Sequence, residues 1–413
     1  MSRYTTLVAQ ARAVAGSAAD VDEVAAALEA SGVNDRVAAD GYGYPSVFAL
    51  ADVVHAVAGR GPAGDVGRRE RPQRIRELLD TLVRAGLHLT PTALAVGAAH
   101  RLGGLPGYAT TALLVAGWSL AQALAFLGYR VAGAAGRPAA ARPLAAGFAA
   151  LAGAWAALLV VNGARPGAWL VCAAQVALFA ANTAALVTGR ERQTLGAALG
   201  CWVAAGLLSV GQAGAGVVAL AVSLAAMTAL AYRPALRTRG RWPERRAYPG
   251  ALRHGLVGAG QAVLFVVVVL APGGRLTLAV PLLVGVPLTE VLLVWHRRRV
   301  ADGRARLADR AAFRDRLVRV AAGSGLALAV PLAGGLAQVG SPRLAAAVLL
   351  AGLYAVCLVL VAHRRPLGAA ALMWWPALVL VLVPLPPAVV LLCAYPVGLF
   401  MALAAMRDPT SYR

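Results

Sequence analysis

The sequence predicts an all-α protein: a polytopic membrane helix bundle of about twelve spans, preceded by a small cytosolic helical module. Three observations predict this class. The 413-residue chain is 60% hydrophobic and 14% charged, whereas soluble proteins carry roughly 25% charged residues. Its apolar residues gather in runs of about twenty, the length that crosses a bilayer core. Its arginines gather between those runs, as topology signals do.

The N-terminal segment, residues 1–60, has the composition of a soluble domain. Residues 21–30 have helical apolar spacing and acids in the first turn, which favours a helix. Asn34 is placed to cap a second helix, and residues 46–57 predict a third. We therefore expect a cytosolic three-helix module over 1–60. A linker and an amphipathic helix on the membrane surface follow over 61–85.

Twelve apolar runs follow the surface helix. The first run is short and contains His88 and Pro91, so ten spans remain an alternative if it and one neighbour do not cross. The expected spans are 86–101, 107–129, 143–162, 167–188, 194–211, 214–231, 255–271, 277–295, 318–336, 344–362, 367–384 and 387–406.

The positions of the arginines predict the orientation of the bundle. All 39 residues counted as lysine or arginine are arginine; 25 fall in loops assigned to the inside and 4 in loops assigned to the outside. By the positive-inside rule, this asymmetry predicts a multi-pass protein of the inner (plasma) membrane with both termini in the cytoplasm. The net charge of +21 therefore reports topology, and we expect no binding of nucleic acid.

A basic cytosolic loop at 232–254 divides the membrane part into two halves, 86–231 and 255–406, each with six expected spans, before a cytosolic tail at 407–413. The halves share one weak sequence similarity. Gln122 lies eight residues before Arg130 at the end of the second span, and Glu290 lies eight residues before Arg298 at the end of the eighth. Repeated six-helix halves are a common plan for transporters.

Five polar residues within the spans are candidates for a substrate path or for coupling. Glu290 is the only acid within an expected span, where a carboxylate is costly unless it is paired, protonated or hydrated. Its alternative role is to pair with nearby arginines. Gln175 and Asn182 are seven residues apart and share a helix face. They either line a polar path or form interhelical hydrogen bonds. Gln122 and Gln261 belong to the same class.

Several kinds of site are not expected in this sequence. The expected outside loops are short and contain no acid or histidine, and nucleotide, zinc and catalytic-triad motifs are absent. The four cysteines lie singly in apolar runs, which is typical of packing residues. We therefore expect no enzyme activity, no metal site and no cofactor.

Residues 309–331, DRAAFRDRLVRVAAGSGLALAVP, join an arginine-rich loop to an apolar span that reaches a proline. This segment, together with the span count, resembles flippases of the multidrug/oligosaccharidyl-lipid/polysaccharide superfamily. The resemblance implies two six-helix lobes around a central cavity, and a lipid-linked substrate whose head group crosses the membrane. The N-terminal module and the scarcity of charges in the spans depart from that family.

The sequence thus favours a transporter or flippase for an amphipathic or lipid-linked saccharide. One alternative is a small-molecule exporter of the major facilitator type, because Leu307–Arg310 (LADR) is similar to that family's cytoplasmic signature. The other alternative is a membrane scaffold that does not transport and recruits a cytosolic protein partner through residues 1–60.

Overall fold

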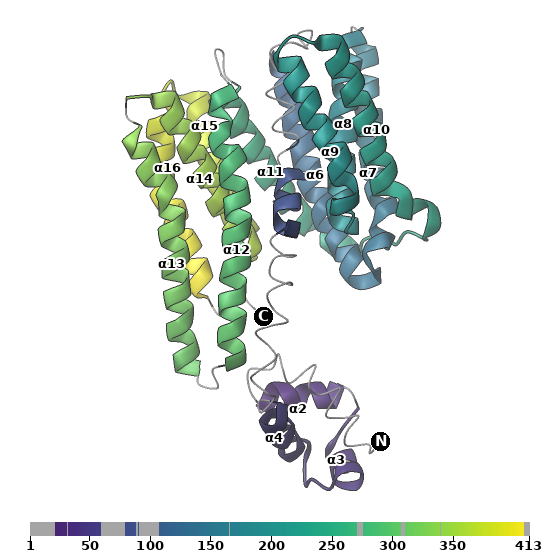
Figure 1. The fold of residues 1–413 in the computed structure, drawn as a ribbon, viewed down its shortest axis with the longest axis vertical. Coiled ribbons are helices and arrows are strands. Elements are labelled where there is room, and N and C mark those ends of the chain that lie inside the picture. Colours follow the sequence, from purple (N-terminus) through teal and green to yellow (C-terminus); the bar gives the residue numbers. More distant parts are fainter. Residues whose placement is uncertain are drawn as a thin grey trace.

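In its described ranges, the computed structural model consists of helices with loops between them and contains no strand (Figure 1). Helix labels follow Figure 1. The structure describes residues 21–30, 32–58, 79–87, 90, 107–164, 166–270, 276–306, 310–338 and 340–408.

The N-terminal module contains three short helices, α2 (Val21–Ala30), α3 (Asp35–Tyr42) and α4 (Val47–Ala58). The capping role expected of Asn34 is confirmed, because its side chain accepts a hydrogen bond from the Val37 amide at 3.0 Å. At the other end of α3, Gly43 adopts a left-handed conformation with φ 77° that ends the helix. The small core contains buried apolar side chains of all three helices: Val24, Leu28, Ala38, Leu50 and Val54.

Long helices at the positions of the second to twelfth expected spans form the rest of the molecule. In the part of the chain that the structure describes, nine helices are long and apolar enough to cross a membrane, which indicates a multi-pass membrane protein. The shorter α15 and the less apolar α9 are not among the nine. The first expected span, 86–101, lies almost wholly outside the described residues. The long helices are α6 (Gly107–Ala135), α7 (Ala141–Val161), α8 (Pro166–Thr188), α9 (Glu191–Ser209), α10 (Ala213–Arg237), α11 (Tyr248–Val268), α12 (Val280–Arg306), α13 (Arg310–Ala337), α14 (Pro342–Ala362), α15 (Pro366–Leu382) and α16 (Pro387–Arg407).

These helices form two groups that meet along α11 (Figure 1). In the first group, α8 packs against α6, α7 and α10, and α10 packs against α9. In the second group, α14 packs against α12, α13 and α16, and α16 packs against α15. The helix α11 contacts α6 of the first group and both α14 and α15 of the second. The helices of each group therefore pack against one another, and α11 joins the two groups.

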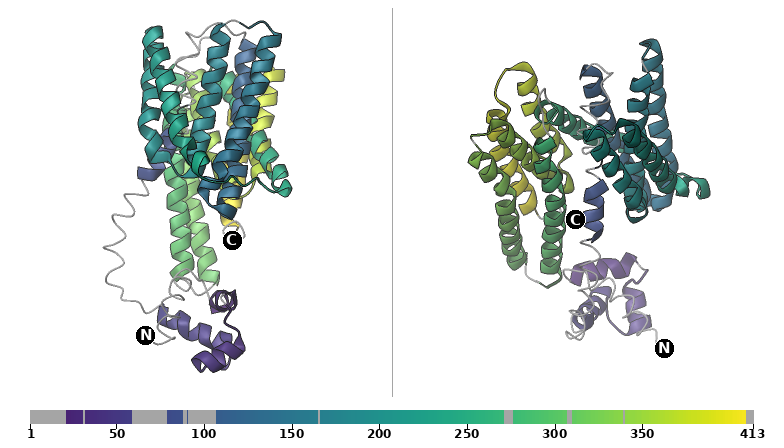
Figure 2. Two further views of the ribbon diagram at one scale, coloured as in Figure 1. Left: turned by 90° about the vertical axis from the view of Figure 1, so that its right-hand side faces the viewer. Right: turned by 45° about the horizontal axis from the view of Figure 1, so that its top comes forward.

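Residues 79–87 form a short helix beside the first group. Thr81, Ala85 and Leu87 of this helix are buried. The C-terminal ends of α6, α10 and α12 lie at one end of the bundle, the end nearest the module and the C-terminus (Figures 1 and 2). We call it the arginine-rich end, because residues 130–142, 232–254 and 296–319 hold 19 arginines.

Candidate functional site

The most extensive helix contact joins α6 to α11, and glycine makes it close. A Cβ added at Gly258 would lie 2.7 Å from the Trp118 carbonyl oxygen, and one at Gly250 would lie 2.6 Å from the Phe126 ring. The Ser119 hydroxyl donates a hydrogen bond of 2.9 Å to the Gly255 carbonyl. Small residues at such positions allow membrane helices to approach closely. The two groups are therefore held together along one seam.

An aromatic cluster lies at this seam, within the apolar stretches of four helices. Trp118 of α6 contacts Phe179 of α8, Phe265 of α11 and Tyr354 of α14, with ring centroids 6.4, 5.8 and 6.4 Å apart. The angles between these rings run from tilted to edge-on, which is the geometry that aromatic pairs prefer. The cluster thus brings together side chains from both groups.

The structure places three of the candidate residues beside the aromatic cluster. Gln175 lies one turn before Phe179, and a Cβ added at Gly117 would lie 3.0 Å from its amide nitrogen. Gln122 lies one turn after Trp118, and its Cγ would be 2.9 Å from a Cβ at Gly258. Gln122 and Gln175 are both half-buried.

The third of these residues, Gln261 of α11, forms hydrogen bonds within the second group. Its side chain is 4% exposed and its amide donates to the Cys357 sulfur at 3.6 Å. Its backbone carbonyl accepts a hydrogen bond from the Tyr354 hydroxyl. Of the two roles considered for such residues, interhelical hydrogen bonding therefore describes Gln261.

Asn182 lies apart from the aromatic cluster. It is seven residues after Gln175 on α8, and its side chain is buried against the helix of residues 79–87. Its amide nitrogen donates to the Leu87 carbonyl, while its carbonyl oxygen has no hydrogen-bond partner among the described residues. The polar face of α8 thus contacts α6 at one level and residues 79–87 at another.

Glu290 lies nearer the arginine-rich end, on the half-buried part of α12 that follows Pro287. Its carboxylate is close enough to act electrostatically on the phenol of Tyr129, which α6 carries in the other group. Tyr129 is also within electrostatic reach of Glu191, Arg84 and Arg137. Although it is 52% exposed, its hydroxyl lies among charges from both groups. Glu290 thus belongs to the second group and acts electrostatically on one residue of the first.

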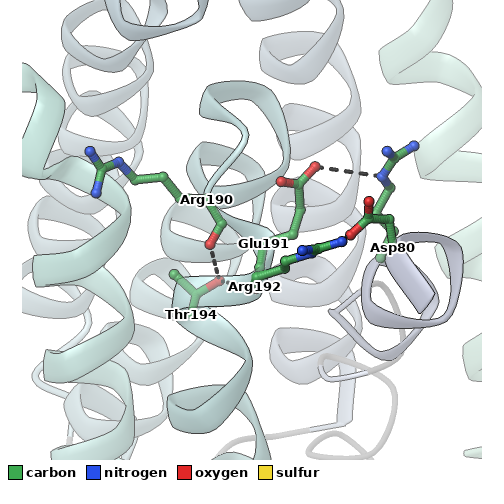
Figure 3. Close-up of polar contacts among 6 residues, drawn as sticks. Asp80, Arg190, Glu191, Arg192 and Thr194 are labelled. Atoms are coloured by element: carbon green, nitrogen blue, oxygen red, sulfur yellow. Dashed lines mark hydrogen bonds and ion pairs between the residues drawn. The ribbon is translucent and has the colours of Figure 1, made fainter. Parts of the chain in front are cut away.

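Two ion pairs join residues 79–87 to the start of α9 at this end of the bundle (Figure 3). Arg192 pairs with Asp80, and Arg84 Nε lies 3.5 Å from Glu191 Oε1. The Asp80 carboxylate raises the pKa of Arg192, chiefly through their hydrogen bond. Glu191 occupies the first turn of α9, where a negative charge is favourable. The Thr194 hydroxyl donates to the Arg190 carbonyl at 3.1 Å and closes the turn.

A pair of histidines in the second group was not expected from the sequence. His296 and His363 are 1% and 3% exposed, and their rings are 5.7 Å apart. His296 Nδ1 is 2.7 Å from the Ser324 hydroxyl, and His363 Nδ1 donates to the Val359 carbonyl at 2.8 Å. Burial lowers the pKa of His363, which lies just beyond the end of α14. No spacing in the sequence joins these residues, because they come from three different helices.

The described residues contain no group of three or more histidine, cysteine or acidic side chains arranged to hold a metal ion. The candidate site is the junction between the two groups of helices, where amide side chains lie beside aromatic rings. Searches of protein-family models, characterised proteins and solved structures find no match to this chain.

Proposed function

We propose that the chain is a twelve-span transporter or flippase of the inner membrane and that its two halves are repeats. The order of helix contacts supports the repeat. If α6 is the second helix of its half and α12 the second of the other, every contact described for the first group has a counterpart in the second. Gln122 and Glu290, which occupy similar positions in the sequences of the two halves, then lie on corresponding helices.

Hydrogen bonds at corresponding places support the same proposal. In the first half, the Trp202 indole nitrogen of α9 donates to the Thr90 hydroxyl at 3.2 Å. In the second half, the Trp374 indole nitrogen of α15 donates to the Leu256 carbonyl of α11 at 2.9 Å. In each case, a tryptophan from the fifth helix of a half reaches the segment assigned to its first helix. The two halves therefore use the same kind of contact.

One observation carries the proposal of transport: amide and aromatic side chains gather within the apolar stretches of the helices, where the two groups meet. Transporters built from repeats hold their substrates at this position, near the middle of the bilayer. Gln122 and Gln175 offer hydrogen bonds to hydroxyl groups, and Trp118 offers an aromatic face. That chemistry suits a saccharide or another amphipathic head group. Glu290, nearer the cytoplasm, is the proposed site of proton coupling.

A reconstitution assay tests the proposal. The protein is placed in liposomes that contain a fluorescent disaccharide linked to polyprenyl diphosphate, and a membrane-impermeant reductant measures how much probe reaches the outer leaflet. We expect faster movement than in protein-free liposomes, and a further increase when a proton gradient is applied. Movement no faster than in protein-free liposomes would contradict the flippase. A small water-soluble probe that moves instead would favour the facilitator-type exporter.

Glu290→Gln tests the coupling role in the same assay. Glutamine has nearly the volume of a protonated glutamate, so the variant should fold but lose the response to the proton gradient. Glu244→Gln is the matched control, because Glu244 is an exposed acid in the basic loop. Activity is normalised to folded protein. If the proton gradient accelerates probe movement in Glu290→Gln as much as in the unchanged protein, the coupling role is refuted.

The scaffold alternative rests on a different observation, the separate core of the N-terminal module. A protein that only recruits partners needs no movement between its halves. A disulfide engineered across the α6–α11 seam would leave a scaffold unaffected but should slow a transporter.

A further inference from the structure

The helices α12 and α13 form a hairpin that extends beyond the apolar part of the bundle. The apolar stretch of α12 ends at Ala301 and that of α13 begins at Phe313, so the helical residues between them lie outside it. A helix of 27 residues such as α12 is about 40 Å long, against about 30 Å for a bilayer core. The free end of the hairpin reaches past the neighbouring helices (Figures 1 and 2).

This hairpin is strongly basic. Residues 296–319 contain nine arginines and three aspartates, a net charge of +6 with neutral histidine. Among the described side chains, Arg297, Arg314 and Arg319 are exposed. The two helices are held together at their base by the buried side chains of Val300 and Leu317. The arginines are therefore presented on a folded element.

The N-terminal module has the opposite charge. Residues 21–58 contain six acidic residues and one arginine, a net charge of −5. Asp22 and Glu29 are exposed and lie seven residues apart on the outer face of α2. On α4, Asp52 is exposed one turn after Phe48, whose side chain is 53% exposed. The outer faces of two helices thus present acids together with an unburied aromatic ring.

The module lies beside the free end of the hairpin in each view (Figures 1 and 2). Twenty residues, 59–78, separate the module from the helix of residues 79–87. When a linker can span two sites of one chain, their effective concentration is on the order of millimolar. At that concentration, even a weak attraction between opposite charges is sufficient for docking.

We propose that the acidic module docks on the arginine-rich hairpin of its own chain, with the outer faces of α2 and α4 against the part of α12 and α13 that carries the exposed Arg297, Arg314 and Arg319. The opposite charges guide the approach, and Phe48 contributes apolar contact. The module then covers the end of the second group from the side that carries the arginines. This interaction requires no transport activity and stands independently of the function proposed above.

Disulfide cross-linking of the full chain in lipid nanodiscs tests the docking. One cysteine replaces the exposed Ala26, between Asp22 and Glu29, and the other replaces the exposed Asp315 on α13. The control pair joins Ala26→Cys to Glu244→Cys, an exposed acid in the basic loop of the first half. The exposed Cys393 is replaced by serine in both. We expect the Ala26/Asp315 pair to cross-link several-fold more than the control pair.

Salt and charge reversal separate docking from chance collision. Raising the salt from about 0.1 M to about 1 M shortens the screening length from about 10 Å to about 3 Å, and should lower the cross-linking several-fold. Asp22→Arg with Glu29→Arg should lower it to the level of the control pair. Adding Arg314→Glu and Arg319→Glu to that variant should restore it.

Three results would overturn the proposal. Equal cross-linking of the two pairs would show that the module has no preferred place. Cross-linked dimers in place of cross-linked monomers would move the contact to a second copy of the chain. The third result is cross-linking that is lost when anionic lipid is added but does not change when the charge of the module is reversed. It would show that the hairpin binds lipid head groups instead of the module.

Discussion

The substitution Gly258→Ala tests whether the seam between α6 and α11 is as close as the structure has it. Gly258 is buried in α11, and an added Cβ would lie 2.7 Å from the Trp118 carbonyl oxygen and 2.9 Å from Gln122 Cγ. Real Cβ atoms essentially never approach so closely, so one helix must shift. The nearer obstacle is backbone, which cannot move away as a flexible side chain can. The methyl group therefore acts on the contact between the two groups.

The size of the effect follows from two opposing terms. Forcing a methyl group into a packed site costs about 1–3 kcal/mol. Replacing glycine by alanine inside a helix contributes up to about 1 kcal/mol in the other direction. A matched control isolates the first term: Gly153 of α7 has nothing within 4 Å of an added Cβ. Gly153→Ala should thus be neutral or slightly stabilising, and Gly258→Ala about 1–3 kcal/mol less stable than that control.

The measurement is unfolding of each purified variant in the same detergent, followed by chemical denaturation or by temperature. The comparison between variants matters more than either value, because detergent affects both alike. If Gly258→Ala proves as stable as Gly153→Ala, the seam is looser than these distances indicate and does not hold the two groups together.

Three further predictions concern topology, the module and pH. A reporter fused after Arg413 should be active in the cytoplasm and one at Gly273 outside; a cytoplasmic signal at Gly273 would break the twelve-span arrangement. Residues 1–60 expressed alone should be helical but marginally stable, since so short a chain buries little apolar area, and a strand-rich circular dichroism spectrum would contradict this. Burial holds the pKa of His363 below its usual value, so its neutral form stabilises the fold above about pH 6.5, and that contribution is lost as the pH falls below it. Unfolding measured from neutral to acidic pH should show this loss, and His363→Gln should reduce it.

The positions of the long helices could be predicted because the length of an apolar run determines them. The expected span 344–362 corresponds to α14, Pro342–Ala362, and 387–406 corresponds to α16, Pro387–Arg407. Some helices extend beyond the expected spans, because helical hydrogen bonding continues after the apolar run has ended. The helix α12 continues to Arg306, past the expected end at residue 295, because arginine is a good helix former and remains helical in water. Likewise, α6 continues past residue 129 to Ala135.

The partners of the candidate residues could not be predicted in this way. Gln261 donates to Cys357, 96 residues later, and the composition of either span gives no sign of the other. Gln175 and Asn182 do lie seven residues apart on one helix, but they meet different neighbours. A helix face is a property of the local sequence, whereas what lies opposite depends on how distant helices pack.

The packing of α11 explains why the junction is the place to look for movement. On one face, Gly258 lies against α6, and the Gly255 carbonyl accepts a hydrogen bond from the Ser119 hydroxyl. On another face, Gly260 lies against Met373 of α15, and the Leu256 carbonyl accepts a hydrogen bond from the Trp374 indole nitrogen. The two groups therefore hold consecutive carbonyls of a single helix. In the proposed transporter the halves move relative to one another. That motion carries α11 along with one group and breaks its hydrogen bond to the other. The contact with α6 is the more extensive one, but it relies on close glycine packing and one hydroxyl donor. The second group adds an indole donor from α15 and the buried Gln261–Cys357 contact with α14, so the seam with α6 is the one we expect to open.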